Sequence, residues 1–237
     1  MNTAISDNIR VVRDNIVKAA LRSGRQPGDV MLVAAAKTHS ADFVRAAIAA
    51  GVDAVGENRV QEMLLKHELG AYVGAPLHFI GALQSNKVNK VVGVCDLIES
   101  VDSAQLLTRI GNRAVSLGIT QNVLIEVNIG EEPQKAGVLP DELPMVLDSV
   151  SQISGVKVLG FMAIPPINYE NDKNRYYFDK MFKLFVDFGA KKYDNVSVRF
   201  LSMGMSDSYT DAILAGANIV RVGSAIFNKR VYTAGGG

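Results

Sequence analysis

Residues 30–38 have the sequence Val-Met-Leu-Val-Ala-Ala-Ala-Lys-Thr, in which seven apolar residues precede a lysine. The run lies between the turn-forming residues 27–29, Pro-Gly-Asp, and Ser40. A continuous apolar run predicts a strand buried on both faces, as in a parallel sheet covered by helices. Lys37 then ends the strand at the edge where α/β folds place their chemistry. Taken alone, the run favours a lysine that extends into solvent over a reactive amine.

Strand and helix patterns alternate along the whole chain. Strands are predicted over 30–37, 53–55, 77–80, 94–98, 122–128, 156–161, 196–201 and 218–222. Helices are predicted over 6–21, with Ser6 as its N-cap, and over 41–50, 58–68, 85–91, 103–117, 140–152, 172–188 and 207–215. This order favours an α/β fold, a single (β/α)8 TIM barrel with an extra N-terminal helix over residues 1–237. No Gly-x-Gly-x-x-Gly follows the first strand, which disfavours an open dinucleotide-binding sheet.

Composition excludes several classes of partner. Of the 237 residues, 25 are basic and 24 acidic, so no strong positive field predicts nucleic-acid binding. No apolar run approaches the roughly 20 residues that span a bilayer, and the N-terminus lacks signal-peptide features. Cys95 is the single cysteine and has no partner for an internal disulfide. Together these features predict a cytoplasmic protein without membrane contact. The three histidines show no metal-ligand spacing with Cys95, and no metal is predicted.

Two glycine- and hydroxyl-containing turns follow the last two predicted strands. In a closed barrel they lie beside Lys37, at the place where barrel enzymes commonly bind phosphate. Gly223 lets the backbone approach a ligand closely, Ser206 and Ser224 add hydroxyl donors, and Arg221 adds a positive charge. Each turn alone also fits an ordinary helix cap or turn, and Arg221 alone also fits an ion pair at the barrel end. Together, an amine, an anion cradle and an arginine describe a site for a phosphorylated aldehyde, of which pyridoxal 5′-phosphate is the commonest.

Five segments, read in order, extend this interpretation to a family. They are residues 33–38, 56–62, 78–87, 202–207 and 220–227, and they resemble the signature segments of the pyridoxal-phosphate homeostasis protein (YggS/PROSC) family from about residue 6 to 228. That family is similar in fold to the N-terminal barrel of alanine racemase. One departure is Arg59, where the family pattern leads us to expect an aromatic residue.

The resemblance implies a cofactor and the residues that bind it. It implies that Lys37 holds pyridoxal 5′-phosphate as a Schiff base and that Arg221 faces its pyridine nitrogen. The phosphate would be held by Ser206, Gly223 and Ser224. The cofactor-binding positions carried over by the matched segments are Lys37, Asn58, Met203, Ser206, Arg221, Gly223 and Ser224.

Three functions fit a barrel with this cofactor site. The resemblance implies a binding protein of vitamin B6 homeostasis, which buffers pyridoxal phosphate or delivers it to apo-enzymes. We expect this protein to be a monomer and not an enzyme. An amino-acid racemase is the alternative, but it needs proton carriers on both faces of the substrate carbon, and we expect the chain to end without the second domain that supplies the opposing tyrosine in alanine racemase. A class I aldolase with a Lys37 Schiff base fits the barrel and cradle but not all five segments.

Overall fold

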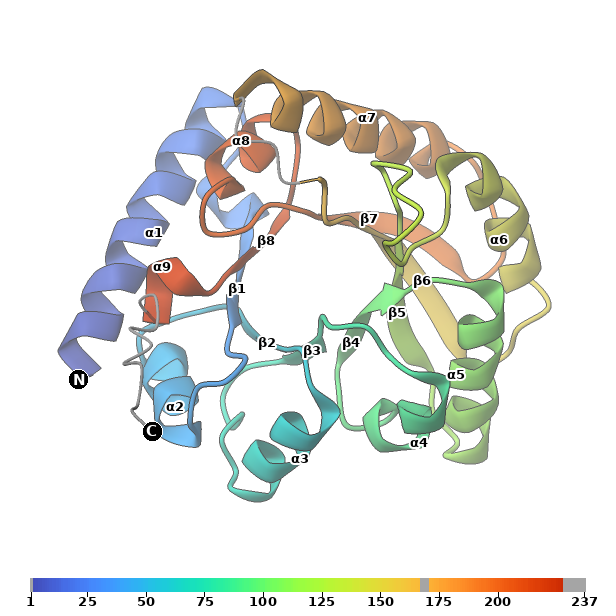
Figure 1. The fold of residues 1–237 in the computed structure, drawn as a ribbon, viewed down its shortest axis with the longest axis horizontal. Helices are drawn as coiled ribbons and strands as arrows, with labels where there is room; N and C mark the ends of the chain where they lie inside the picture. The colour runs from blue at the N-terminus through green and yellow to red at the C-terminus, as the bar shows by residue number, and fades with distance from the viewer. Residues whose placement is uncertain (1, 167–170, 228–237) are drawn as a thin grey trace, which may run out of the picture.

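The fold is a closed barrel of eight parallel strands in chain order (Figure 1). A computed structural model of the chain describes residues 2–166 and 171–227. Strand β8 pairs with β1, so that the first and last strands complete the ring. The strands are β1 Met31–Ala35, β2 Ala54–Glu57, β3 Leu77–Phe79, β4 Leu97–Val101, β5 Gln121–Glu126, β6 Val156–Met162, β7 Val196–Ser202 and β8 Ile219–Val222.

A ring of helices covers the outside of the barrel (Figure 1). Helix α1 carries the buried residues Ile9, Val12, Ile16 and Ala20 at helical spacing and packs against α2, α8 and α9. The helices are α1 Asn2–Arg22, α2 Ala41–Ala49, α3 Val60–Glu68, α4 Val88–Val91, α5 Ala104–Ser116, α6 Leu143–Val150, α7 Asn171–Gly189, α8 Tyr209–Leu214 and α9 Ser224–Phe227. Short 3-10 turns at Pro27–Asp29, Ser85–Lys87 and Pro140–Glu142 precede β1, α4 and α6.

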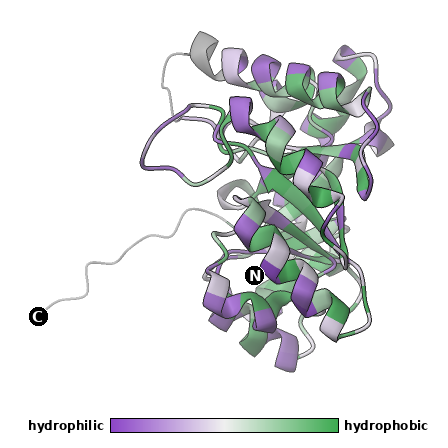
Figure 2. Ribbon diagram, turned by 90° about the vertical axis from the view of Figure 1, so that its right-hand side faces the viewer, coloured by the Kyte–Doolittle hydropathy of each residue, from purple (hydrophilic) through white to green (hydrophobic). Residues whose placement is uncertain are grey.

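Burial separates two apolar cores. The larger lies between the strands and the helices, and it contains Leu32 and Ala34 of β1. The smaller fills the barrel and contains Val33 of β1 and Ile219 of β8. Successive strand residues point to opposite faces, so the continuous apolar run of β1 supplies both cores. Figure 2 shows the apolar residues concentrated along the strands and polar residues on the outer helices.

A bulge in β6 adjusts the inner core. Val123 of β5 pairs with Val158 of β6, but Ile125 pairs with Phe161, so β6 has one extra residue between these two pairs. Gly160 has a φ of 143°, and a Cβ there would lie 2.0 Å from the carbonyl oxygen of Phe200. Glycine is therefore required for this close approach, and the shift lets Leu159 and Met162 both contribute to the core inside the barrel.

The predicted barrel is confirmed, and the differences concern the ends of elements and one short helix. Helix α1 begins at Asn2, so Ser6 lies within it and is not its N-cap. Strand β4 spans 97–101, three residues later than predicted, because apolar Val94 and Cys95 pack from a turn. The last helix, α9, was not predicted. No helix among residues 2–166 and 171–227 has the length and apolar character needed to cross a membrane.

Candidate functional site

Lys37 lies just beyond the C-terminal end of β1. Ala36 is buried, whereas Lys37 is exposed, so its amine is available at the barrel mouth. The next residue, Thr38, has a φ of 65°. This left-handed conformation is uncommon for a β-branched residue and costs on the order of 1–3 kcal/mol, so neighbouring groups must hold the turn.

The turns after β7 and β8 are joined beside this lysine. The Ser206 hydroxyl oxygen accepts the backbone N–H groups of Gly223 at 3.1 Å and Ala225 at 3.2 Å. These two bonds occupy the oxygen's acceptor capacity and leave its single hydrogen to donate to a ligand. A Cβ at Gly223 would lie 3.2 Å from the carbonyl oxygen of Ala35, so this turn packs closely against the end of β1.

Arg221 is held inside the barrel below these turns. Arg221 is 4% exposed, and its Nη1 donates to the Ser202 hydroxyl oxygen at 2.6 Å. Its Nη2 donates to the Ala163 carbonyl oxygen at 3.0 Å. Burial lowers the pKa of Arg221, while the carboxylates of Glu99 and Glu126 raise it. An arginine nevertheless stays protonated, so the site contains a fixed positive charge.

A chain of buried polar side chains supports Arg221. Glu99 accepts the Ser202 hydroxyl at 2.5 Å, and its other carboxylate oxygen lies 2.7 Å from Nδ1 of His78. Burial alone would raise the pKa of Glu99, but His78, Arg221 and Ser202 together bring it below its ordinary value. These polar contacts therefore pair the Glu99 carboxylate with the Arg221 guanidinium inside the barrel. His78, in the middle of β3, belongs to this layer through its contact with Glu99.

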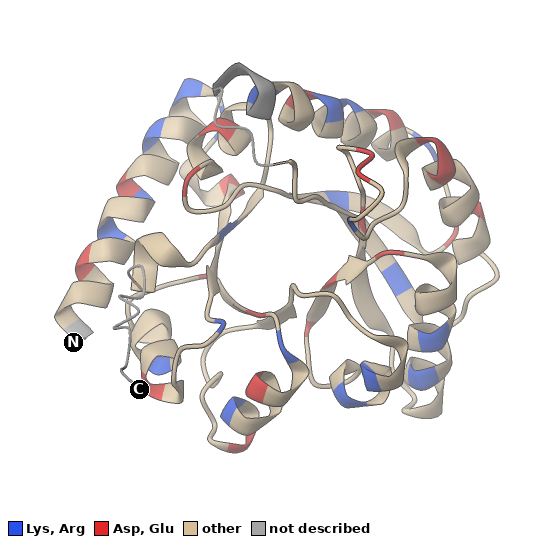
Figure 3. Cartoon of the chain, viewed as in Figure 1, with Lys and Arg blue, Asp and Glu red and all other residues tan. Residues whose placement is uncertain are grey.

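Glu126, at the end of β5, is the second carboxyl group of this layer. It is 9% exposed, and burial raises its pKa to about 7. The charge of Arg221 lowers this pKa, and the charge of Asp102 adds to the increase. Figure 3 shows that most charged residues lie on the outer helices, which sets the charged residues on the strands apart. Burial therefore places the pKa of Glu126 near neutrality, in the same buried layer as the Arg221 guanidinium.

Asn58 and Met203 differ in their surroundings. Asn58 follows β2, and its Oδ1 is buried without a hydrogen-bond partner within the described chain. A Cβ at Gly81 would lie 2.2 Å from the Asn58 carbonyl oxygen, so the turns after β2 and β3 are in tight contact. Met203 is fully buried in the core between strands and helices. The role of Met203 in binding the cofactor stays a prediction.

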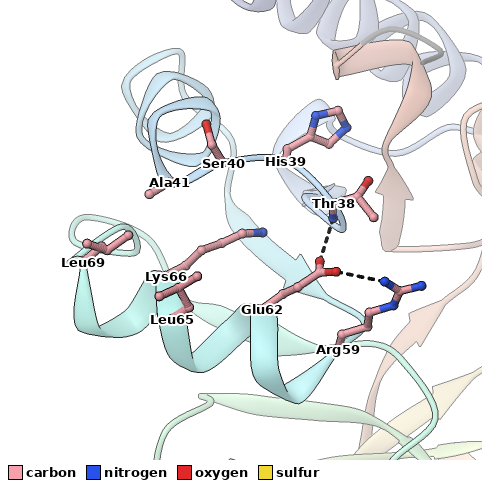
Figure 4. Close-up of a pocket in the computed structure, with 9 residues that line it drawn as sticks. All are labelled: Thr38, His39, Ser40, Ala41, Arg59, Glu62, Leu65, Lys66 and Leu69. Atoms are coloured by element: carbon pink, nitrogen blue, oxygen red, sulfur yellow. Dashed lines mark hydrogen bonds and ion pairs between the residues drawn. The ribbon is translucent and has the colours of Figure 1, made fainter. Parts of the chain in front are cut away.

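Helix α3 lies against the Lys37 turn and contributes a buried ion pair. The Nζ of Lys66 donates to Glu57 Oε1 at 2.6 Å, and the Tyr72 hydroxyl donates to the same oxygen at 3.0 Å. Burial raises the pKa of Glu57 despite the opposing effects of Lys66 and Tyr72. A pocket of about 560 Å³ lies between this turn and α3, and Figure 4 shows the residues that line it. It is lined by Thr38, His39, Ser40, Ala41, Arg59, Glu62, Leu65, Lys66 and Leu69.

The structure brings most predicted site residues to one end of four neighbouring strands. They are Lys37 after β1, Asn58 after β2, Ser206 after β7, and Arg221, Gly223 and Ser224 in or after β8. An exposed amine beside hydroxyl groups and a buried guanidinium fits an aldehyde that carries an anionic group.

Within the described part of the chain, no group of three His, Cys, Asp or Glu side chains could hold a metal ion.

The supporting residues were not found by sequence reasoning. Glu99 and Ser202 are 103 positions apart, and Lys66 and Ala36 are 30 apart, so their contacts depend on the closed barrel. One signal was present in the sequence: Glu99 interrupts an apolar run, and a charged residue within a buried strand needs a partner.

Comparison with known proteins identifies the family. The family model of the alanine racemase N-terminal domain matches residues 3–230. The pyridoxal phosphate homeostasis protein of Aquifex aeolicus (strain VF5) is 41% identical over 221 residues, which are 93% of this chain and 96% of that protein. The protein of the same name from Escherichia coli (strain K12) is 37% identical, over 97% of this chain and 98% of that protein.

Solved structures agree with this assignment. PipY of Synechococcus elongatus PCC7942 with PLP bound is 32% identical and superposes with a TM-score of 0.81, over 94% of this chain and 99% of that chain. An alanine racemase of Clostridium difficile 630 is 16% identical with a TM-score of 0.69, and 61% of its chain is covered, which shows a common fold only. The chain therefore belongs to the pyridoxal phosphate homeostasis protein family, and its barrel is that of the alanine racemase N-terminal domain.

Proposed function

We propose that this protein binds pyridoxal 5′-phosphate on Lys37 and serves vitamin B6 homeostasis by buffering the cofactor or delivering it. The observation that carries the proposal is the exposed Lys37 just after β1, two residues beyond Ala35, against which the Gly223 turn with its Ser206 contact packs. Family membership and the PLP-bound PipY relative support the same cofactor. When bound, the cofactor supplies an aldehyde carbon that forms a C=N bond with the Lys37 nitrogen, and the aldehyde oxygen leaves as water.

The described residues fit the cofactor's anionic end. The free hydrogen of the Ser206 hydroxyl and the Ser224 hydroxyl would donate to phosphate oxygens. The absence of a side chain at Gly223 lets this turn lie close to the end of β1, where a Cβ would be 3.2 Å from the Ala35 carbonyl oxygen. The unpaired Oδ1 of Asn58 is an acceptor that a ligand donor would satisfy. Phosphate anchoring would let a reversible bond at Lys37 hold the molecule firmly.

Arg221 would determine what chemistry the bound cofactor can perform. A guanidinium has only donors, so opposite the pyridine nitrogen it would donate a hydrogen bond and oppose protonation of that nitrogen. Strong carbanion chemistry depends on a protonated ring nitrogen. We therefore propose that the protein holds and releases the cofactor without turning over amino acids.

Further parts of the proposal concern location and partners. We propose that the protein acts in the cytoplasm as a monomer and that apo-enzymes receive its cofactor. Light scattering after size exclusion, with a mass near the 25.5 kDa of one chain, is the expected result for a monomer. Transfer to an apo-enzyme would appear as gain of that enzyme's activity when holo-protein is the sole cofactor source.

A titration followed by absorbance tests the assignment. Wild-type protein is expected to develop the Schiff-base band as pyridoxal 5′-phosphate is added, and Lys37→Ala is expected to lose the band while keeping its fold. Lys87→Ala, also at a lysine after a strand end, is the matched control. An unchanged band in Lys37→Ala would contradict the assignment.

A second assay separates a carrier from a racemase. Holo-protein is incubated with alanine, serine and other amino acids, which are then resolved by chiral chromatography. A carrier is expected to leave them unchanged. Racemisation or deamination at a turnover number of about 1 s⁻¹ or more, the ordinary enzyme range, would make the racemase alternative the better account.

A further inference from the structure

One helix holds both peptide groups that flank Lys37. The backbone N–H of Thr38, on one side, donates to Glu62 Oε2 at 2.8 Å. The carbonyl oxygen of Ala36, on the other side, accepts from Lys66 Nζ at 2.9 Å. Glu62 and Lys66 are four residues apart on α3 and therefore lie on the same helix face, as Figure 4 shows.

The two α3 side chains are themselves fixed. Lys66 has a side chain 6% exposed, and its amine also binds the fully buried Glu57. Glu62, whose side chain is 26% exposed, accepts a second bond from Arg59 Nη1 at 3.1 Å. Burial alone would raise the pKa of Glu62, but the bonds from Thr38 and Arg59 and the nearby cations bring it below its ordinary value. Each of the two side chains therefore makes at least two polar contacts that hold it in place.

The turn between them is in a conformation that needs such support. Thr38 is a β-branched residue with a φ of 65°. Without an acceptor for its N–H, this residue would lose one of the contacts that hold it in the left-handed region. A rotation there would change the orientation of the peptide that joins it to Lys37.

We propose that Glu62 and Lys66 are positioning residues that fix the backbone at Lys37 and so favour its bond to the cofactor. This inference rests on the proposed function, because the reaction that it serves is that of the Lys37 amine. Fixing the backbone in advance removes part of the ordering cost that bond formation would otherwise carry. The effect is specific to ligands that react with Lys37 and does not extend to ligands held by the phosphate turns alone.

The experiment compares Glu62→Ala with Glu62→Gln, in which the side-chain amide oxygen can still accept the Thr38 N–H. Glu68→Ala is the control, since it removes an exposed carboxylate from the same helix. Two ligands are titrated: pyridoxal 5′-phosphate, which reacts with the lysine, and pyridoxamine 5′-phosphate, which has no aldehyde. Hydrogen exchange of the Thr38 amide is measured by NMR on the cofactor-free protein.

Glu62→Ala is expected to weaken pyridoxal 5′-phosphate binding about tenfold and to speed exchange of the Thr38 amide by at least about tenfold, the size of a lost hydrogen bond to a charged group. Binding of pyridoxamine 5′-phosphate should not change, and Glu62→Gln should resemble wild type. Equal weakening of both ligands, or no change in either, would overturn the inference.

Failure of the proposed function has a different signature. In that case Lys37→Ala would bind each of the two ligands as tightly as wild-type protein does, because no bond forms at Lys37. The inference about cofactor binding would then fail as well, and the exchange rate of Thr38 would report only whether Glu62 holds the turn.

Discussion

Glu126→Gln is expected to stabilise the protein at pH 8 and to change its stability little at pH 4. Glu126 is buried at the end of β5, and burial raises its pKa from 4.5 to about 7. Between these two values the folded protein keeps a proton that the unfolded chain releases. The free energy of unfolding contributed by this group therefore falls as the pH rises.

The magnitude follows from the two pKa values. One unit of difference in pKa corresponds to 1.36 kcal/mol. A pKa of about 7 in the folded protein against 4.5 in the unfolded chain therefore lowers the free energy of unfolding by about 3 kcal/mol. The loss begins near pH 4.5, is complete a little above pH 7 and stays constant at higher pH. Glutamine resembles the protonated acid in size and is neutral at every pH, so the variant lacks this loss.

Urea unfolding of the cofactor-free protein between pH 4 and pH 8, at constant ionic strength, measures the effect. Glu57 also has a raised pKa, so it lowers the free energy of unfolding of wild type and variant equally as the pH rises. The difference between the two curves therefore isolates Glu126. Glu68→Gln, at an exposed position on α3, is the control and should follow wild type. Parallel curves for wild type and Glu126→Gln would show that Glu126 is not shifted in the folded state.

Further predictions concern the buried pair and the phosphate turns. Lys66→Met should lower the free energy of unfolding by about 3–5 kcal/mol, because the buried Glu57 carboxylate loses its cation, and adding Glu57→Gln should restore a large part of it in urea titrations. The double variant Ser206→Ala, Ser224→Ala should lose about 1.5–3 kcal/mol of cofactor binding for each hydroxyl, yet still saturate at high cofactor concentration; an unchanged dissociation constant would place the phosphate elsewhere. Gly223→Ala should bind the cofactor more weakly than wild type, since its Cβ would crowd the Ala35 carbonyl oxygen and displace the turn, and equal affinity would show that the position of this turn does not affect the ligand.

The fold was largely predictable from the sequence because its signal is local. Apolar runs and helical spacing define each strand and helix, and alternation of the two leaves few topologies for a parallel sheet. The predicted start of β4 was wrong, because Val94 and Cys95 are apolar but pack into the core from a turn. An apolar run shows that residues are buried and does not show whether their backbone is extended.

The candidate site was predictable where it depends on topology. Once a barrel is assumed, residues at the ends of β1, β2, β7 and β8 must meet, and Lys37 and Ser206 follow from that step alone. The contacts of Glu62 and Lys66 with the Lys37 turn were not predictable, because they depend on how α3 packs and on the left-handed Thr38. Side-chain orientation of this kind is set by tertiary contacts and leaves no periodic signal in the sequence.

Borohydride reduction of the holo-protein, followed by proteolysis and mass mapping, tests the central claim most directly. Reduction converts a C=N bond between lysine and cofactor into a stable amine, so the modified residue can be located. The account predicts one pyridoxyl group per chain, on the peptide that contains Lys37, and none in Lys37→Ala. A pyridoxyl group on another lysine, with Lys37 unmodified, would contradict it.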